Sequence, residues 1–109
     1  MELKWTSKAL SDLARLYDFL VLACKPSAAR TVQSLTQAPV ILLTHPRMGE
    51  QLFQFETREV RRIFAGEYEI RYELTDQTIY ILRLWHTREN RQIWGPPGIW
   101  KINHVKTIF

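Results

Sequence analysis

The feature that most constrains the fold is a strict alternation of apolar and charged residues from position 67 to position 74. Successive side chains of a β-strand point to opposite faces, so a period of two is typical of a strand with one buried face. The apolar face would hold Tyr68, Ile70, Tyr72 and Leu74, and the charged face Glu67, Glu69, Arg71 and Glu73. We therefore predict a half-buried strand.

A second strand is predicted from Ile79 to Trp85, because its apolar residues occupy both parities, as in a strand covered on both faces. We interpret it as the central strand. Asp76 and Gln77 interrupt the pattern and predict a hairpin with a two-residue turn. This register pairs Leu74 with Ile79, Tyr72 with Ile81, Ile70 with Arg83, and Tyr68 with Trp85. It places Arg83 on an otherwise apolar face.

The run from Arg58 to Phe64 is predicted to be the first strand of a three-strand meander. A turn near Ala65 and Gly66 would place Ile63 beside Tyr68 and Arg62 beside Glu69. These assignments depend on register, because a slip of one residue turns every side chain to the other face.

Two amphipathic helices are predicted before the meander. The first begins at Thr6 or Ser7, whose hydroxyl can act as N-cap, and it ends near Cys24, before Pro26. Its apolar stripe contains Leu10, Leu13, Leu16 or Tyr17, Leu20 and Val21, whereas Ser11, Asp12, Arg15 and Asp18 are assigned to the face in water.

The second helix has Ser27 as its predicted N-cap and a stripe of Ala28, Val32 and Leu35. Pro39 lacks an amide hydrogen, so the helix should kink there or restart with Pro39 in its first turn. In either case helix is predicted to continue through Leu43 and to be stopped by His45-Pro46, and the segment from Arg47 to Glu50 is predicted to be a loop that leads to the sheet.

With a short strand at 3–5 in front, the order is βααβββ. This order predicts an α+β fold in which two antiparallel helices pack as one layer on a small antiparallel sheet. The predicted domain spans residues 1–91, and residues 92–109 form an atypical tail with tryptophan, proline and glycine. Pro96 and Pro97 exclude a helix or regular strand there. We expect the tail to dock on its own sheet or to become ordered in a complex.

The length of 109 residues suits one domain with one core. Lys and Arg number 15 against 11 Asp and Glu, a formal charge of +4, which favours an acidic protein or a nucleic acid as partner. The single cysteine, Cys24, excludes an internal disulfide and a cysteine-rich zinc site, and we expect it to be partly buried near a helix end. There is no apolar run of membrane-spanning length and no signal-type run after Glu2, so we expect a cytoplasmic protein.

His86 and Arg88 lie two residues apart at the end of the last strand, so an extended backbone points both to one side. Such a pair could serve a metal-free ribonuclease, with Arg88 stabilising charge on a phosphate and His86 exchanging a proton. The alternative is that Arg83 and Arg88 form ion pairs with Glu69, Glu89 or an acidic partner. The sequence has no nucleophile elbow, glycine-rich phosphate loop or metal-ligand spacing, so we expect no cofactor and no metal.

Aromatic residues are interspersed among the arginines of the second half. On a nucleic-acid platform such rings would stack bases, whereas at strand spacing they are more typical of a core. We expect core positions for Tyr68, Tyr72 and Trp85.

The order of elements and several motifs together resemble the RelE/ParE superfamily of bacterial type II toxins. The run from Trp5 to Leu20, with Asp12-Leu13 and Phe19-Leu20, resembles the first strand and helix of the ParE branch. Pro46-Arg47-Met48-Gly49 is similar to the loop that precedes its sheet. The sheet itself is matched by Tyr68, Ile70 and Tyr72, followed by Ile79, Ile81, Leu84, His86 and Arg88.

The resemblance implies a toxin neutralised by a cognate antitoxin, whose disordered C-terminal segment folds on the toxin and forms a hetero-oligomer with it. Members with RelE activity cut messenger RNA in the ribosome, whereas members of the ParE branch inhibit DNA gyrase and are not nucleases. Glu69 lies where RelE members carry a phosphate-binding arginine, and a carboxylate there would repel phosphate. The ParE branch is therefore favoured.

The resemblance also implies sites. A RelE-like catalytic site would consist of Arg62, His86 and Arg88. In the ParE interpretation, the residues expected to recognise gyrase are Arg58, Arg61, Arg62, Arg83, His86 and Arg88. Those expected to contact the antitoxin are Leu13, Leu16, Tyr17, Leu20, Arg83 and Trp85. A third hypothesis, from another class, is a basic binding module without toxicity.

Overall fold

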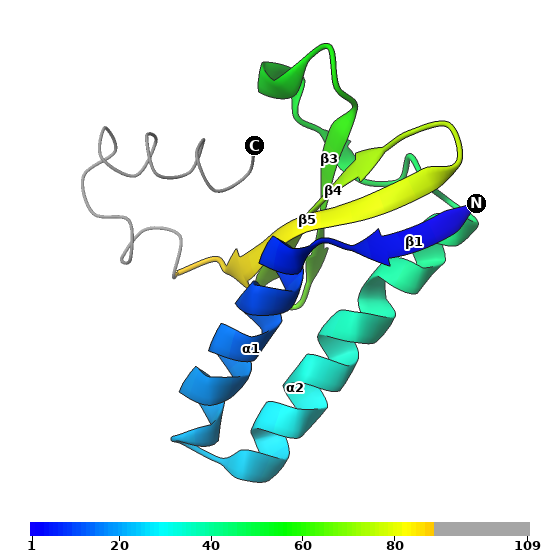
Figure 1. Ribbon diagram of the computed structural model, residues 1–109. Helices are drawn as coiled ribbons and strands as arrows, with labels where there is room; N and C mark the ends of the chain where they lie inside the picture. The colour runs from blue at the N-terminus through cyan, green and yellow to red at the C-terminus, as the bar shows by residue number, and fades with distance from the viewer. Residues whose placement is uncertain (89–109) are drawn as a thin grey trace.

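The computed structural model describes residues 1–88, which form one layer of two helices packed on one sheet (Figure 1). In chain order the elements are β1 (Glu2–Trp5), α1 (Ser7–Val21), α2 (Lys25–Gln37), the 3₁₀ helix η1 (Ala38–Leu43), β2 (Glu50–Gln51), the 3₁₀ helix η2 (Phe53–Phe55), β3 (Val60–Ala65), β4 (Tyr68–Leu74) and β5 (Thr78–His86). The predicted α+β architecture is confirmed. The predicted tail 92–109 lies outside the described residues. No helix within residues 1–88 has the length and apolar character needed to cross a bilayer.

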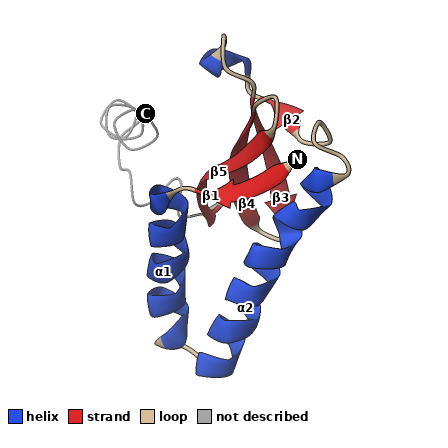
Figure 2. Ribbon diagram, turned by 45° about the vertical axis from the view of Figure 1, so that its right-hand side comes forward, coloured by secondary structure: helices blue, strands red, loops and turns tan. Residues whose placement is uncertain are grey.

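The strands of the described region form a 5-stranded sheet in the order β1-β5-β4-β3-β2, with both helices on one face (Figure 2). β1 pairs with β5 in parallel, whereas the other pairs are antiparallel. The sheet is therefore mixed, whereas a wholly antiparallel sheet was predicted. After β1 the chain returns to the sheet only through the helices, and this long connection lets β1 and β5 run in the same direction. β5 is an interior strand with residues of both parities buried, as predicted, but the middle strand is β4.

Thr6 begins α1 as predicted. Its Oγ1 accepts a hydrogen bond from the Ala9 amide at 3.2 Å and donates to the carbonyl oxygen of Ile81 at 2.8 Å. The same hydroxyl therefore caps the helix and fastens it to β5. The helix ends at Val21, slightly before the predicted end.

The second helix begins earlier than predicted, at Lys25, with Cys24 as N-cap in place of Ser27. Pro26 lies in the first turn, where its missing amide hydrogen removes no intrahelical bond. Cys24 is exposed, so its predicted partial burial is wrong. The predicted restart at Pro39 is confirmed, because this proline lies in the first turn of η1.

The β3–β4 turn lies one residue after the predicted one, which shifts the strand register by two residues and pairs Arg62 with Arg71 instead of Glu69. Ala65 pairs with Tyr68, so the turn consists of Gly66 and Glu67, and Ile63 pairs with Ile70 instead of Tyr68. Gly66 has φ +63°, a left-handed conformation that glycine adopts without a steric penalty. The positive φ decides where the chain reverses, and the alternation pattern does not reveal it.

The β4–β5 register is confirmed near the turn, where Leu74 pairs with Ile79 and Tyr72 with Ile81. A bulge follows, since Arg71 pairs with Arg83 and Leu82 is the extra residue. The pairs beyond it are Ile70 with Leu84 and Tyr68 with His86, so the two predicted pairs there are wrong by one residue.

The main core lies between the helices and the sheet and includes the apolar face of β4 as predicted. A smaller cluster on the opposite face contains Leu52, Val60 and Leu82, with Phe55 and Tyr80 packed against it. The segment around η2 thus covers part of the face that was predicted to be in water. Phe55 of this segment lies over Arg71, and Arg71 and Glu69 are buried, with exposed fractions of 7% and 4%.

Replacing the cap tests how α1 is fastened. We expect Thr6→Ala to lower the free energy of unfolding by about 1–2 kcal/mol, because the Ala9 amide loses its acceptor and Ile81 loses a donor. Urea unfolding followed by circular dichroism measures this. Thr6→Ser keeps the hydroxyl and should remain close to wild type, as should Ser7→Ala. Equal losses in Thr6→Ser and Thr6→Ala would contradict the role of the hydroxyl.

Candidate binding surface

Three arginines lie side by side across the sheet. Arg62 of β3 pairs with Arg71 of β4, which in turn pairs with Arg83 of β5. We call these three residues the arginine row. Like charges directly opposite one another destabilise a sheet, so the row requires counter-ions.

Each member of the arginine row has a carboxylate close by. The Arg62 guanidinium lies 2.8 Å from Glu50 and 3.5 Å from Glu69, and Arg71 lies 3.2 Å from Glu69. Glu69 therefore bridges two arginines from a buried position. This compensates the repulsion within the row, and it places a fixed negative charge on the face of the sheet opposite the helices.

Arg71 is also held by aromatic rings. Its guanidinium carbon lies 5.3 Å from the ring centre of Phe55 and 4.8 Å from that of Trp85, within the range of cation–π attraction. Burial lowers the pKa of Arg71 below its ordinary value, although Glu69 opposes that shift. Phe55 and Trp85 are thus part of the packing around the arginine row.

Arg83, the third member of the row, is paired with Asp12 of α1. The Asp12 carboxylate accepts from Arg83 Nε at 2.7 Å, from Arg83 Nη2 at 3.1 Å and from the Leu84 amide at 3.1 Å. Both side chains are buried, with exposed fractions of 5% for Asp12 and 11% for Arg83. The prediction that Asp12 faces water is therefore wrong.

The position of Asp12 follows from the end of β1. β1 pairs with β5 up to Trp5, opposite Ile81, and the chain then enters α1. The outer edge of β5 beyond Ile81 therefore lies beside α1, where Asp12 accepts the Leu84 amide in place of a strand carbonyl. Arg83 supplies the positive charge that a buried carboxylate requires.

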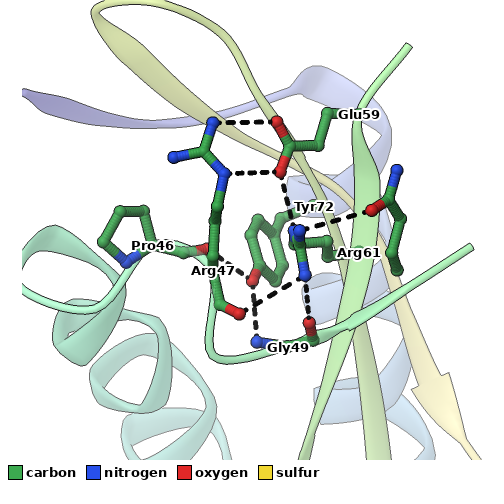
Figure 3. A network of polar contacts seen from close by, with 7 residues as sticks. Pro46, Arg47, Gly49, Glu59, Arg61 and Tyr72 are labelled. Carbon is green, nitrogen blue, oxygen red and sulfur yellow. Dashed lines mark hydrogen bonds and ion pairs between the residues drawn. The ribbon is translucent and has the colours of Figure 1, made fainter. Parts of the chain in front are cut away.

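A second polar network fixes the loop between η1 and β2 (Figure 3). The Tyr72 hydroxyl donates to the carbonyl oxygen of Pro46 at 2.7 Å and accepts from the Gly49 amide at 3.1 Å. A Cβ atom on Gly49 would lie 2.6 Å from this hydroxyl oxygen, so no other residue fits there without a shift. The loop is thus tied to the middle strand through one tyrosine.

Charged groups reinforce the same loop. Arg61 donates to the carbonyl oxygen of Gly49 at 2.8 Å and to Glu59 at 2.8 Å, and Arg47 binds the same carboxylate with both Nε and Nη2. Burial would raise the pKa of Glu59, but hydrogen bonds and charge from Arg61 and Arg47 outweigh it, so the pKa lies below its ordinary value. The hydrogen bonds of Arg61 therefore hold the loop in place.

Arg58 lies at the other end of this region. It binds Glu73 of β4 through two nitrogen atoms, with Nε at 2.9 Å. Together with Arg47 and Arg61 it borders a shallow hollow of about 510 Å³. These three cations are partly accessible there, although each has a carboxylate partner.

His86 and Arg88 lie near the free end of β5. The His86 ring packs edge-on against Tyr68 with 5.1 Å between ring centres, and its Nε2 lies 3.8 Å from Glu67. Its Nδ1 accepts a hydrogen bond from the backbone amide of Arg88 at 3.1 Å. The Arg88 side chain is exposed.

The six residues expected to recognise the target thus lie in four places. Arg62 and Arg83 belong to the arginine row, but Arg83 is buried against α1. Arg61 lies in the loop network, Arg58 beside Glu73, and His86 and Arg88 at the end of β5. The proposed RelE-like set is also spread out, since Arg62 lies in β3 and His86 in β5, with β4 between them.

The residues expected to contact the antitoxin are largely inside the domain. Leu13, Leu16, Arg83 and Trp85 are buried, and Tyr17 and Leu20 are half-buried. The large apolar side chains that α1 and the turn after it leave exposed are Leu10, Phe19 and Leu22.

Asp12, Arg71 and Tyr72 organise the surface, but their roles were not predicted. One signal was present, because Arg83 lies within an apolar run, where it requires a buried carboxylate, and Asp12 borders the apolar stripe of α1. The predicted place of Arg83 on the apolar face is itself wrong, since the bulge pairs it with Arg71 of the charged face. The role of Arg71 depends on the bulge in β5, and that of Tyr72 depends on the loop before β2. No local sequence pattern predicts either the bulge or the position of this loop.

The buried ion pair is testable by a double-mutant cycle. We expect Asp12→Ala to lower the free energy of unfolding by about 3–5 kcal/mol, because it leaves the buried Arg83 charge uncompensated. Arg83→Met should cost a similar amount, and the double variant clearly less than the sum of the two. Asp18→Ala, on the exposed face of the same helix, is the control with little change. Additive losses would contradict direct coupling.

The loop network predicts an acid-dependent loss of stability. Because the folded pKa of Glu59 lies below its ordinary value of 4.5, its contribution is fully present above that value and is lost as pH falls through the folded pKa. Glu59→Gln should be less stable than wild type at neutral pH and should lose less stability between about pH 5 and pH 3. Urea unfolding across this range measures both. The exposed Glu56→Gln is the control, and parallel curves for wild type and Glu59→Gln would refute the assignment.

Comparisons with known proteins agree with this architecture. The family described as the ParE toxin of type II toxin-antitoxin system, parDE, matches residues 3–91. A solved structure titled "Chromosomal ParDE TA system from P. aeruginosa" is 28% identical in sequence with a TM-score of 0.67, and the match covers 79% of this chain and 95% of that chain. No curated protein matches the chain significantly.

The family match extends over nearly all of the described residues, and the TM-score indicates that the similar structure shares this fold. The chain therefore belongs to the ParE toxin family of type II toxin–antitoxin systems.

Proposed function

We infer that this toxin arrests growth by inhibiting DNA gyrase, that a cognate antitoxin neutralises it, and that it acts in the cytoplasm where gyrase is found. The observation that carries the choice of target is the position of Glu69. This buried carboxylate lies 3.2 Å from Arg71 and 3.5 Å from Arg62, on the sheet face opposite the helices. The same face is where a RelE-like nuclease would hold a phosphate.

A fixed carboxylate weakens the case for RNA cleavage. Stabilising the transition state of phosphodiester cleavage requires positive groups aimed at the developing charge. Here Glu69 neutralises part of that charge, and Glu50 engages Arg62 as well. Arg62 lies in β3 and His86 in β5, and β4 separates their two strands. The arrangement suits a binding protein better than a nuclease.

We propose that gyrase, or its complex with DNA, is recognised by the cations that have exposed area, namely Arg58, Arg62 and Arg88, with His86 beside Arg88. Arg58 and Arg62 keep 37% and 30% of their side chains exposed although both have carboxylate partners. An acidic partner could exchange with those carboxylates at modest cost, since exposed ion pairs contribute little stability.

For the antitoxin we propose that a disordered C-terminal segment folds on the toxin, with contacts centred on α1. Leu10 of this helix is 52% exposed, and Tyr17, seven residues on and so on the same side, is half-buried. Phe19, which is 66% exposed, and the half-buried Leu20 lie on other sides of the helix near its C-terminal end. An amphipathic segment that covers such side chains would gain apolar burial and so offset the entropy lost on ordering.

One pair of assays distinguishes the targets. The purified toxin is added to gyrase with plasmid DNA and, separately, to translating ribosomes with messenger RNA. We expect inhibited supercoiling or trapped cleaved DNA in the first assay and intact messenger RNA in the second. Cleaved messenger RNA with unaffected gyrase would refute the proposal. If the protein neither inhibits gyrase nor arrests growth on induction, the binding-module hypothesis would replace it.

The exposed cation at the end of β5 provides a sharper test. We expect Arg88→Ala to weaken gyrase inhibition about tenfold, as loss of one charge-assisted contact would, while antitoxin affinity stays unchanged. Arg30→Ala, an exposed arginine on α2, is the matched control with full inhibition. Equal activity of the two variants would remove Arg88 from the recognition surface.

A further inference from the structure

β1 is the outermost strand of the sheet, and within residues 1–88 no strand pairs with its outer edge (Figure 2). The amides of Glu2 and Thr6 donate to the carbonyl oxygens of Gln77 and Ile81 on the β5 side. Backbone groups alternate in direction along a parallel pair, so Leu3 and Trp5 point their N–H and C=O groups outward. The edge therefore presents backbone donors and acceptors to an incoming strand.

The side chains of β1 are sorted by face. Leu3 and Trp5 pack against the core under the sheet, whereas Glu2 and Lys4 lie on the opposite face with 70% and 55% of their side chains exposed. Glu2 and Lys4 are 3.6 Å apart within the chain. The edge thus carries one negative and one positive charge, equally spaced about Leu3.

This arrangement is self-complementary. If a second β1 approaches antiparallel, with the twofold axis at Leu3, the two Leu3 residues exchange backbone hydrogen bonds. Glu2 of each copy then lies opposite Lys4 of the other. Directly opposite residues in such a pair interact, and opposite charges stabilise it. A single repeated charge would instead repel its own copy, which is how many edge strands avoid pairing.

We propose that two copies of this chain associate through their β1 edges. The two β1 strands pair antiparallel, and the two sheets become one continuous sheet. The contact is isologous, with the same residues contributed by both copies, as in most homodimers. It is independent of the target and of the antitoxin, because it uses neither the arginine row nor α1 as its main contact.

Exposed apolar side chains also lie on the segments next to β1. Met1, directly before β1, is 52% exposed, and η1, which contacts β1, carries Val40 and Ile41 with exposed fractions of 46% and 47%. Burying such side chains adds apolar area beside a short backbone ribbon. Because β1 has only 4 residues, the dimer should be weak and should depend on concentration.

Charge exchange tests the proposal with the full-length chain. Sedimentation equilibrium should show a reversible monomer–dimer equilibrium for wild type. Glu2→Lys and Lys4→Glu should each weaken it about tenfold or more, because two attractive pairs become repulsive. The double variant with both changes should dimerise like wild type, and an equimolar mixture of the two single variants should form a heterodimer. Lys25→Glu, an exposed change of the same charge far along the chain, is the control and should leave the equilibrium unchanged.

Amide hydrogen exchange locates the contact. The outward amides of Leu3 and Trp5 should exchange more slowly as the concentration of the chain rises, and Lys4→Glu should abolish this protection. A monomer at every concentration up to about 1 mM would overturn the proposal. So would a dimer that is insensitive to both single charge changes. Protection of Leu3 and Trp5 only after antitoxin is added would assign the edge to the antitoxin and also overturn it.

Discussion

The placement of α1 on the sheet depends on the buried ion pair between Asp12 and Arg83. β1 ends at Trp5, so the second half of β5 has no strand on its outer side, and the Leu84 amide would be left without an acceptor. Asp12 supplies that acceptor and pairs with Arg83 at 2.7 Å. Neither charge would be stable in the core without the other, because an uncompensated buried ion costs several kcal/mol. The helix, the strand edge and the arginine row therefore hold one another in place.

The arginine row gives the protein its cationic sheet, but internal carboxylates control how much of that charge faces outward. Asp12 and Glu69 are buried beside Arg83 and Arg71, whereas Arg62 and Arg58 have partners near solvent. The charge available to a partner is thus found at the margins of the row. This distribution supports the proposal that the sheet docks a macromolecule and does not hold a phosphate for cleavage.

Much of the fold could be predicted from local patterns, as the cap at Thr6 and the pairing of Leu74 with Ile79 illustrate. The hydroxyl before an apolar run identified the start of α1, and the interruption at Asp76 and Gln77 identified the β4–β5 turn. The errors arose where a long-range contact decides the outcome. Asp12 was assigned to water because its pairing partner is 71 residues away in the chain. Glu69 and Arg71 were assigned to the charged face of a half-buried strand, and a strand pattern does not show that Phe55 and Trp85 lie over Arg71.

The sequence by itself determined the α+β class, the positions of both helices, the strands of the meander and the resemblance to the toxin superfamily, because these depend on periodicity and on turn and cap residues. Only the tertiary structure decided which charges are buried, where the bulge at Leu82 shifts the register, and which cations stay accessible. The physical reason is that a charge is stable inside a protein only when its counter-ion is delivered by another element. That delivery depends on how the elements pack, as when α1 brings Asp12 to Arg83.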